Sequence, residues 1–128
     1  MVKIESIEMV QVQESHYEFI RALRIHPENI KGFLTQTTIS SEDQMKYMKR
    51  YSGCYRICLV NGEPAGYVGV IDKDIRICTH PLFKGIGVGY HMLSEIIKIF
   101  PEASGRILKE NIASQNLFIK CNVPYELI

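Results

Sequence analysis

The sequence predicts a mixed α/β fold in which a mostly antiparallel central sheet is flanked by helices, and three observations carry this prediction. Residues 54–79 form apolar segments of strand length joined by short turns, which makes consecutive segments antiparallel neighbours. Residues 87–100 and 114–121 instead repeat apolar side chains at helical spacing. Two further strands, predicted over 106–110 and 124–128, alternate with those helices.

The N-terminal part adds a strand and a first helix to this prediction. Residues 3–12 ("KIESIEMVQV") alternate apolar and polar side chains loosely, as expected for a strand with a break. Residues 15–25 change to a helical period, and this helix ends before Pro27 because the residue preceding a proline is disfavoured in the α conformation. Residues 28–39 ("ENIKGFLTQTTI") fit either a short helix or an irregular segment.

A second helix is predicted over residues 40–51. Ser40 can accept a hydrogen bond from the first free N–H groups, and Asp43 stands three residues on, as in a capping box. We assign the apolar face of this helix to core packing; it consists of Met45, Met48 and Tyr51.

Turn residues separate the strands of the central part. Asn61-Gly62 supplies the positive φ angles that a two-residue hairpin turn requires, and residues 72–74 form a second short turn. Further along the chain, Pro101 ends the helix predicted over residues 87–100. The two turns separate three predicted strands, which span residues 54–60, 65–71 and 75–79.

Length, composition and charge limit the classes of function. With 128 residues, 46% of them hydrophobic, the chain is expected to form one domain, residues 1–128. Its formal net charge of +1 argues against a general binder of nucleic acid or of membrane surfaces. No segment approaches the ~18–20 apolar residues of a membrane span, and the N-terminus lacks the apolar stretch of a signal peptide. We therefore expect a cytoplasmic protein.

The four cysteines, Cys54, Cys58, Cys78 and Cys121, form no CxxC pair, and no histidine pair has zinc-finger spacing. Two disulfides are the alternative to free thiols, but this composition can build a core without them. We expect reduced, mostly buried thiols and no metal site.

The segment 84–89 ("KGIGVG") places three alternating glycines where a strand gives way to a helix. The first N–H groups of a helix have no internal partner and carry partial positive charge, so glycines there let an anion approach the backbone. Lys84 adds a full positive charge. The segment therefore predicts an anion site, and a pyrophosphate is the expected ligand.

These glycines have three other interpretations. A turn without a ligand is the simplest, although turns rarely need three alternating glycines. A Walker A loop requires the lysine after the glycines, whereas Lys84 precedes them. A dinucleotide fingerprint requires GxGxxG and a distant acidic residue; Glu110 has a suitable position, but the spacing is GxGxG and antiparallel strands precede the loop.

Residues 79–93 ("THPLFKGIGVGYHML") resemble the acetyl-CoA signature of the GNAT superfamily of acyl-CoA N-acyltransferases, V-x-P-x-x-[RQ]-G-x-G-[IV]-[GA]-x-x-L. Pro81 and the glycines match, Lys84 stands for the Arg or Gln, and Leu93 falls one place late. Residues 110–123 ("ENIASQNLFIKCNV") resemble a second family motif, N-x-x-[AS]-x-x-x-[YF]-x-K-x-G-F. The two motifs stand in the family's order and, with the predicted elements, cover most of the chain.

The resemblance implies a GNAT-like sheet in which the parallel strands 75–79 and 106–110 splay apart around acetyl-CoA. The pantetheine arm would lie between them, held in part by Asn111, while backbone groups of the first strand polarise the thioester carbonyl. The coenzyme-binding residues so implied are Ile77, Cys78, Thr79, Lys84, Gly85, Ile86, Gly87, Val88, Gly89, Asn111, Asn116 and Phe118.

The chain departs from the family pattern at the residue that protonates the leaving thiolate. Many members have a tyrosine there, whereas this chain has Phe118, and Asn122-Val123 replaces the family's Gly-Phe. Water or another side chain must then supply the proton, and we assign Ser114 and Tyr125 as catalytic candidates. The remaining candidates are Tyr90 and Cys121.

For the general base, the resemblance points to the entrance of the strand 75–79, where some members place a carboxylate. Asp74 is the candidate that we assign, with Asp72 beside it. Both also fit plain turn chemistry, since aspartate hydrogen-bonds locally in turns. His80 and His91 flank the glycine loop and receive no catalytic role.

The implied activity is direct transfer of an acetyl group from acetyl-CoA to a primary amine of a small molecule. Residues 23–33 and 39–51 resemble a segment of members that acetylate amino sugars on nucleotide carriers, and in the family these helices wall the acceptor site. We therefore expect residues 27–40 to be mobile or ordered by substrate. A homodimer is compatible with the resemblance, and a non-catalytic coenzyme A sensor or interaction module is the alternative function.

Overall fold

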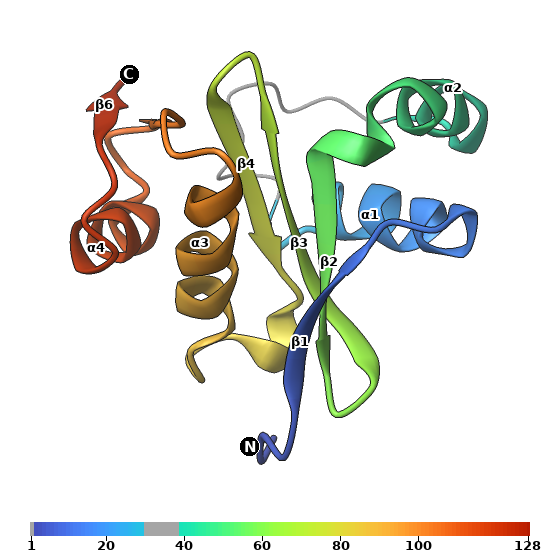
Figure 1. Ribbon diagram of the computed structural model, residues 1–128, viewed down its shortest axis with the longest axis horizontal. Coiled ribbons are helices and arrows are strands. Elements are labelled where there is room, and N and C mark those ends of the chain that lie inside the picture. Colours follow the sequence, from blue (N-terminus) through green and yellow to red (C-terminus); the bar gives the residue numbers. More distant parts are fainter. Residues whose placement is uncertain (1, 30–38) are drawn as a thin grey trace.

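The protein has a mixed α/β fold, described here from a computed structural model that covers residues 2–29 and 39–128 (Figure 1). Residues 27–40 are expected from the sequence to be mobile or ordered by substrate. Most of this segment, residues 30–38, lies outside the described residues. The elements are β1 (Ile7–Gln11), α1 (Tyr17–Arg24), α2 (Ser41–Tyr51), β2 (Tyr55–Val60), β3 (Glu63–Ile71), β4 (Asp74–Thr79), α3 (Val88–Ile99), β5 (Gly105–Ile107), α4 (Ile112–Lys120) and β6 (Tyr125–Leu127). The predicted fold class is confirmed.

The central sheet has the order β1-β2-β3-β4, and every neighbouring pair is antiparallel. The predicted hairpin turn has positive φ at Asn61 (52°) and Gly62 (81°), as a two-residue turn with matched twist requires. The Asn61 side chain also accepts hydrogen bonds from the N–H groups of Glu5 and Ser6, at 2.8 and 3.0 Å. These bonds hold the chain just before Ile7, where β1 begins, and account for the break predicted within residues 3–12.

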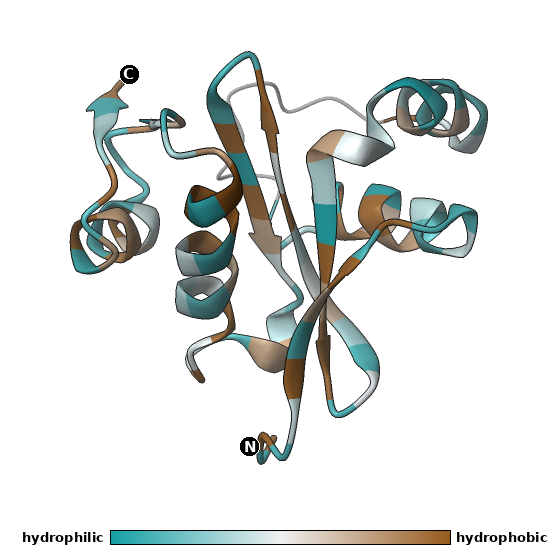
Figure 2. Cartoon of the chain, in the orientation of Figure 1, coloured by the Kyte–Doolittle hydropathy of each residue, from teal (hydrophilic) through white to brown (hydrophobic). Residues whose placement is uncertain are grey.

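Two hydrophobic clusters lie on opposite faces of this sheet. Helix α3 covers one face, whereas α1 and α2 lie over the other (Figure 1). On β3, Tyr67 and Val68 belong to opposite clusters because successive side chains of a strand alternate between the two faces. The strands of the sheet accordingly carry hydrophobic residues over much of their length (Figure 2). In the described part of the chain, no helix has the length and apolar character needed to cross a membrane.

Helix α2 begins as predicted, with Ser40 Oγ accepting from the Asp43 N–H at 3.1 Å. Its predicted apolar face is partly wrong: Met48 is fully buried, but Met45 is 39% exposed and the polar Gln44 is buried instead. The two buried positions are four residues apart, so the inward-facing stripe runs through Gln44 and Met48.

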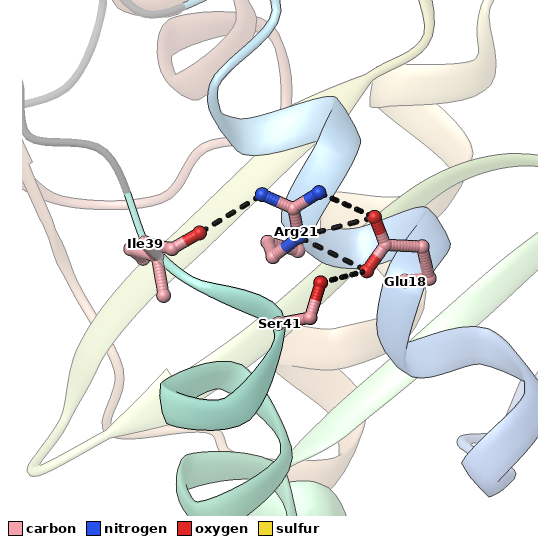
Figure 3. A network of polar contacts seen from close by, with 4 residues as sticks. All are labelled: Glu18, Arg21, Ile39 and Ser41. Carbon is pink, nitrogen blue, oxygen red and sulfur yellow. Dashed lines mark hydrogen bonds and ion pairs between the residues drawn. The ribbon is translucent and has the colours of Figure 1, made fainter.

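A polar network joins α1 to the start of α2 (Figure 3). Arg21 pairs with Glu18 on its own helix and donates from Nη1 to the Ile39 carbonyl at 2.9 Å. Ser41 Oγ donates to the second oxygen of Glu18 at 3.2 Å. This network fixes how the two helices meet at the face of the sheet.

Strands β4 and β5 separate after a single point of contact. A parallel bridge joins Asp74 to Ser104, where the Ile75 N–H donates to the Ser104 carbonyl at 3.0 Å. Past this bridge, β5 pairs in parallel with β6 instead. This geometry matches the predicted splay.

The boundaries of β5 and α4 differ from those predicted. The strand ends at Ile107 rather than at residue 110 because the chain turns, with the Asn111 N–H donating to the Leu108 carbonyl at 2.9 Å. Helix α4 then begins at Ile112 rather than at residue 114. Asn111 sets this start, since its Oδ1 accepts from the Ser114 N–H at 3.2 Å and caps the helix.

Candidate functional site

The glycines of residues 84–89 have two different structural roles. Gly85 (φ 80°) and Gly87 (φ 93°) adopt the left-handed conformation, and Gly87 is the N-cap of α3. A Cβ built on either would meet no atom within 4 Å, so this side of the loop is open. A Cβ on Gly89 would instead lie 3.3 Å from Leu117 Cδ2, so Gly89 permits the close approach of α3 and α4. Two glycines therefore shape the loop and the third serves packing.

A groove of about 850 Å³ runs from this loop along β4 to α4; we call it the loop groove. Most residues predicted to bind the coenzyme line it: Ile77, Cys78, Thr79, Lys84, Gly85, Gly87, Val88, Gly89, Asn111 and Asn116. Ile86, also predicted, packs against the hydrophobic cluster on the α3 face. Phe118, the last of the predicted residues, lines a different cavity, described below.

The backbone of β4 presents alternate residues to the opening between β4 and β5. The Ile75 N–H points toward Ser104, away from β3, so the backbone groups of Ile77 and Thr79 point the same way. The backbone of Cys78 faces β3 instead, and its Sγ lies 3.8 Å from the Leu23 carbonyl. Of the three predicted backbone contacts, the geometry thus directs those of Ile77 and Thr79 into the opening.

A second cavity of about 550 Å³ lies between the helices α1 and α2 and the strands β4 and β5; we call it the tyrosine pocket. Tyr47, Tyr55 and Tyr67 line it, and the hydroxyls of Tyr47 and Tyr55 are hydrogen-bonded at 2.7 Å. Burial raises the pKa of Tyr55 and of Tyr67 above the ordinary value of 10.0, so both remain neutral phenols that can donate hydrogen bonds.

Asp74 is the half-buried carboxylate of the tyrosine pocket. Its Oδ2 lies 3.9 Å from Nε of Arg76, and Arg106 also acts on it electrostatically. Burial raises the pKa of Asp74 above 3.8 and outweighs the opposing effect of the two arginines. Asp74, the residue predicted from the sequence as the general base, is therefore a carboxylate at the wall of a cavity, and its affinity for protons is increased.

The loop groove and the tyrosine pocket meet at three residues that line both, Ile77, Asn111 and Ser114. Ile77 comes from β4, whereas Asn111 and Ser114 come from the cap and first turn of α4. A group held in the groove can therefore be presented to a molecule in the pocket. Ser114, a predicted catalytic residue, lies at this junction.

The other predicted proton donors lie in different places. Tyr125 is on β6 and lines neither cavity; its ring packs edge-on against Phe118, with centroids 6.1 Å apart. Phe118 borders the tyrosine pocket but is only 2% exposed. Tyr90 lines the loop groove, and its carbonyl lies 3.9 Å from Sγ of Cys121.

The four cysteines are free thiols in the structure; Cys58 and Cys78 are buried, whereas Cys54 and Cys121 are partly exposed. Burial raises the pKa of Cys58 to about 11 and that of Cys78 to about 12, so both stay protonated at neutral pH. In the described residues, no group of three or more His, Cys, Asp or Glu side chains could hold a metal ion.

The tyrosine pocket contains residues that sequence reasoning did not select. They are Tyr47, Tyr55, Tyr67, Arg76 and Arg106. One usable signal was Arg76, two residues after Asp74, because residues two apart on a strand share a face. The tyrosines gave no comparable signal, since aromatic residues in strands are also expected in a core.

Comparison with known proteins gives matches at the level of structure alone. No family model and no curated protein matches the chain. A domain from Methanocaldococcus jannaschii superimposes with a TM-score of 0.79 at 24% identity, covering 91% of this chain and 87% of that one.

Two enzymes have the same architecture. Spermidine N-acetyltransferase from Vibrio cholerae, solved with CoA and spermine, matches with a TM-score of 0.76 at 12% identity, over 90% of this chain and 79% of that one. A GNAT-family acetyltransferase from Bacillus anthracis matches with a TM-score of 0.71 at 11% identity, over 94% of this chain and 81% of that one. At these identities the likeness concerns the fold, and the chain therefore has the fold of GNAT-family acetyltransferases.

Proposed function

We propose that this protein is an acetyl-CoA-dependent N-acetyltransferase that acts on a primary amine of a small molecule. One observation carries the proposal: two cavities on the two sides of the β4–β5 opening meet at Ile77, Asn111 and Ser114. Such a junction suits a direct transfer, because donor and acceptor can then be held with their reacting atoms close together. The fold shared with GNAT-family acetyltransferases supports the same activity.

The loop groove would hold the coenzyme. The free N–H groups at the start of α3 and the Lys84 ammonium suit a pyrophosphate, and Gly85 and Gly87 leave that side of the loop open. Acetyl-CoA would supply an activated acetyl group at the junction of the cavities. The Ile77 N–H, which points into the opening, is placed to donate a hydrogen bond to a carbonyl oxygen there.

Asp74 and Ser114 are the residues that we assign to proton transfer. In the overall reaction the amine nitrogen forms a bond to the acetyl carbon, the carbon–sulfur bond breaks, and the amine loses a proton while the sulfur gains one. Asp74, in the tyrosine pocket, accepts the amine proton directly or through water. Ser114, at the junction, donates to the sulfur because Phe118 has no proton to give.

The acceptor amine is assigned from the N-terminal resemblance and from the lining of the tyrosine pocket. We propose an amino sugar, on the strength of the N-terminal resemblance and of a pocket lined by tyrosine hydroxyls, and a cytoplasmic site of action. A coenzyme A sensor is the second candidate, and the specific observation that favours it is Phe118 at the position of the usual acid.

A thiol-release assay with acetyl-CoA and a panel of primary amines, amino sugars included, tests the activity. Amine-dependent release of free thiol, with the acetylated amine detected by mass spectrometry, is the expected result. Tight binding of acetyl-CoA without turnover of any amine would contradict catalysis and favour the sensor.

A further inference from the structure

The charged side chains of the tyrosine pocket are not balanced. Among the described residues, its lining includes the arginines Arg24, Arg76 and Arg106 but only the aspartates Asp43 and Asp74. A pocket built for a purely cationic acceptor would be expected to carry the opposite excess, because like charges repel a ligand and opposite charges attract it.

Arg76 extends from the same face of β4 as Asp74. The distance of 3.9 Å between Arg76 Nε and Asp74 Oδ2 is long for a hydrogen-bonded ion pair, and 43% of the arginine side chain is exposed. The guanidinium carries five N–H donors, so this contact leaves it able to bind a further anion. The Tyr55 phenol, which interacts with Arg76, helps to hold the guanidinium at the pocket wall.

Arg106 approaches from β5, across the opening from β4. Its carboxylate neighbour is Glu126, at 3.5 Å, and both side chains are more than half exposed. Exposed ion pairs of this kind contribute little, so a ligand can displace Glu126 at small cost. Arg76 and Arg106 both act electrostatically on Asp74, and all three residues line the tyrosine pocket.

We propose that the acceptor carries an anionic group, a carboxylate or a phosphate, in addition to its amine, and that Arg76 and Arg106 bind this group. The inference rests on the proposed function, because it specifies the substrate class for the same pocket. The amine of such a molecule lies toward Asp74, and its anion lies between guanidiniums that come from two strands. Neither arginine lines the loop groove, so these cations are separate from those available to the coenzyme phosphates.

Matched pairs of acceptors test this assignment. Glucosamine 6-phosphate is compared with glucosamine, and 4-aminobutanoate with 4-aminobutanamide, so that each pair differs only in its anion. Thiol release gives kcat/KM, and calorimetry with CoA-loaded protein gives the affinity for each amine without requiring turnover. The variants are Arg76→Gln and Arg106→Gln, with Arg76→Lys as the conservative change. Arg50→Gln on α2 is the matched control, because Arg50 stacks on Tyr51 and lines neither cavity.

We expect the wild type to favour the anionic member of at least one pair by about tenfold or more, since a hydrogen-bonded charge contributes that much. Each Arg→Gln change should lower kcat/KM and affinity for the anionic member more than for the neutral member and so remove this preference, while Arg50→Gln retains it. The pair that responds distinguishes phosphate from carboxylate.

Equal use of both members, or an equal loss for both in the arginine variants, would overturn the inference and leave the transferase activity standing. If the anionic member binds in a way that depends on the arginines but is not acetylated, the result would support the acceptor site and contradict the proposed transfer.

Discussion

Ser114 is the α4 side chain that lines both cavities, and it gives the most specific test of proton transfer. Ser114→Ala should lower kcat by ~10-fold or more while leaving the affinity for acetyl-CoA within about twofold, because general-acid help acts on the chemical step. Ser94→Ala is the control, since that hydroxyl contacts Cys121 Sγ and lines neither cavity. Steady-state kinetics and calorimetry measure the two effects. An unchanged kcat would assign the proton to water or to another group.

Asp74 should determine the acidic limb of the pH–rate profile. Because burial raises its pKa above 3.8, activity that needs the ionised carboxylate should be lost as pH falls through this raised value. Asp74→Asn should lower kcat/KM by ~100-fold and remove this limb. A variant that keeps the wild-type profile would show that another group is the base.

The raised pKa of Asp74 also has a consequence for stability. A carboxyl group whose folded pKa exceeds its unfolded pKa binds protons more tightly when folded, so its contribution to stability falls as pH rises from about 3.8 through the folded pKa. Asp74→Asn should therefore lose less stability than the wild type over this interval. Urea melts at several pH values measure the difference, and parallel curves would contradict the assigned direction.

Phe118 provides a further test at the scale of single residues. With 2% of the residue exposed and its ring against Tyr125, a hydroxyl added by Phe118→Tyr would be buried among apolar groups. We expect the free energy of unfolding to fall by ~1–3 kcal/mol, the cost of an unpaired buried hydroxyl, without a gain in turnover. A faster enzyme of unchanged stability would instead mean that the hydroxyl reaches the reacting sulfur.

At the scale of elements, the packing of β5 against α4 depends on Gly105. A Cβ at this position would lie 2.4 Å from Cε2 of Phe118, so one of the two elements must move. Gly105→Ala should therefore lower the free energy of unfolding by ~1–3 kcal/mol, the usual cost of overpacking. Gly53→Ala is the matched control, since a Cβ there meets nothing within 4 Å. Denaturant unfolding of both variants measures the difference. Equal free energies of unfolding for Gly105→Ala and Gly53→Ala would contradict this packing.

Local chemistry made some elements predictable and others not. The hairpin at Asn61-Gly62 and the start of α2 at Ser40 follow from turn and cap residues, and the structure has both. The end of β5 and the start of α4 differ from the predicted bounds because the motif at Asn111 predicts ligand binding and does not reveal helix capping. The Asn111 side chain also caps α4, which moves the start of the helix to Ile112.

At the scale of the whole molecule, the two cavities differ in how far the sequence reveals them. The loop groove is lined mainly by residues of two local motifs, 79–93 and 110–123, so the sequence patterns predict it. The tyrosine pocket combines Tyr47, Tyr55, Arg76 and Arg106, which come from four elements. Their convergence depends on how α1 and α2 pack on the sheet and how β4 and β5 separate, and no local pattern encodes either.

The central claim is that the open side of residues 84–89 binds the coenzyme, and amide NMR during an acetyl-CoA titration tests it most directly. Substitution of Gly87 is a poorer test because its φ of 93° would strain any side chain. We predict saturable shifts that are largest for the amides of residues 84–90 and of Ile77 and Thr79. The amide of Glu8, on β1 at the opposite edge of the sheet from β4, should barely shift. No saturable binding, or shifts centred on another surface, would contradict the account.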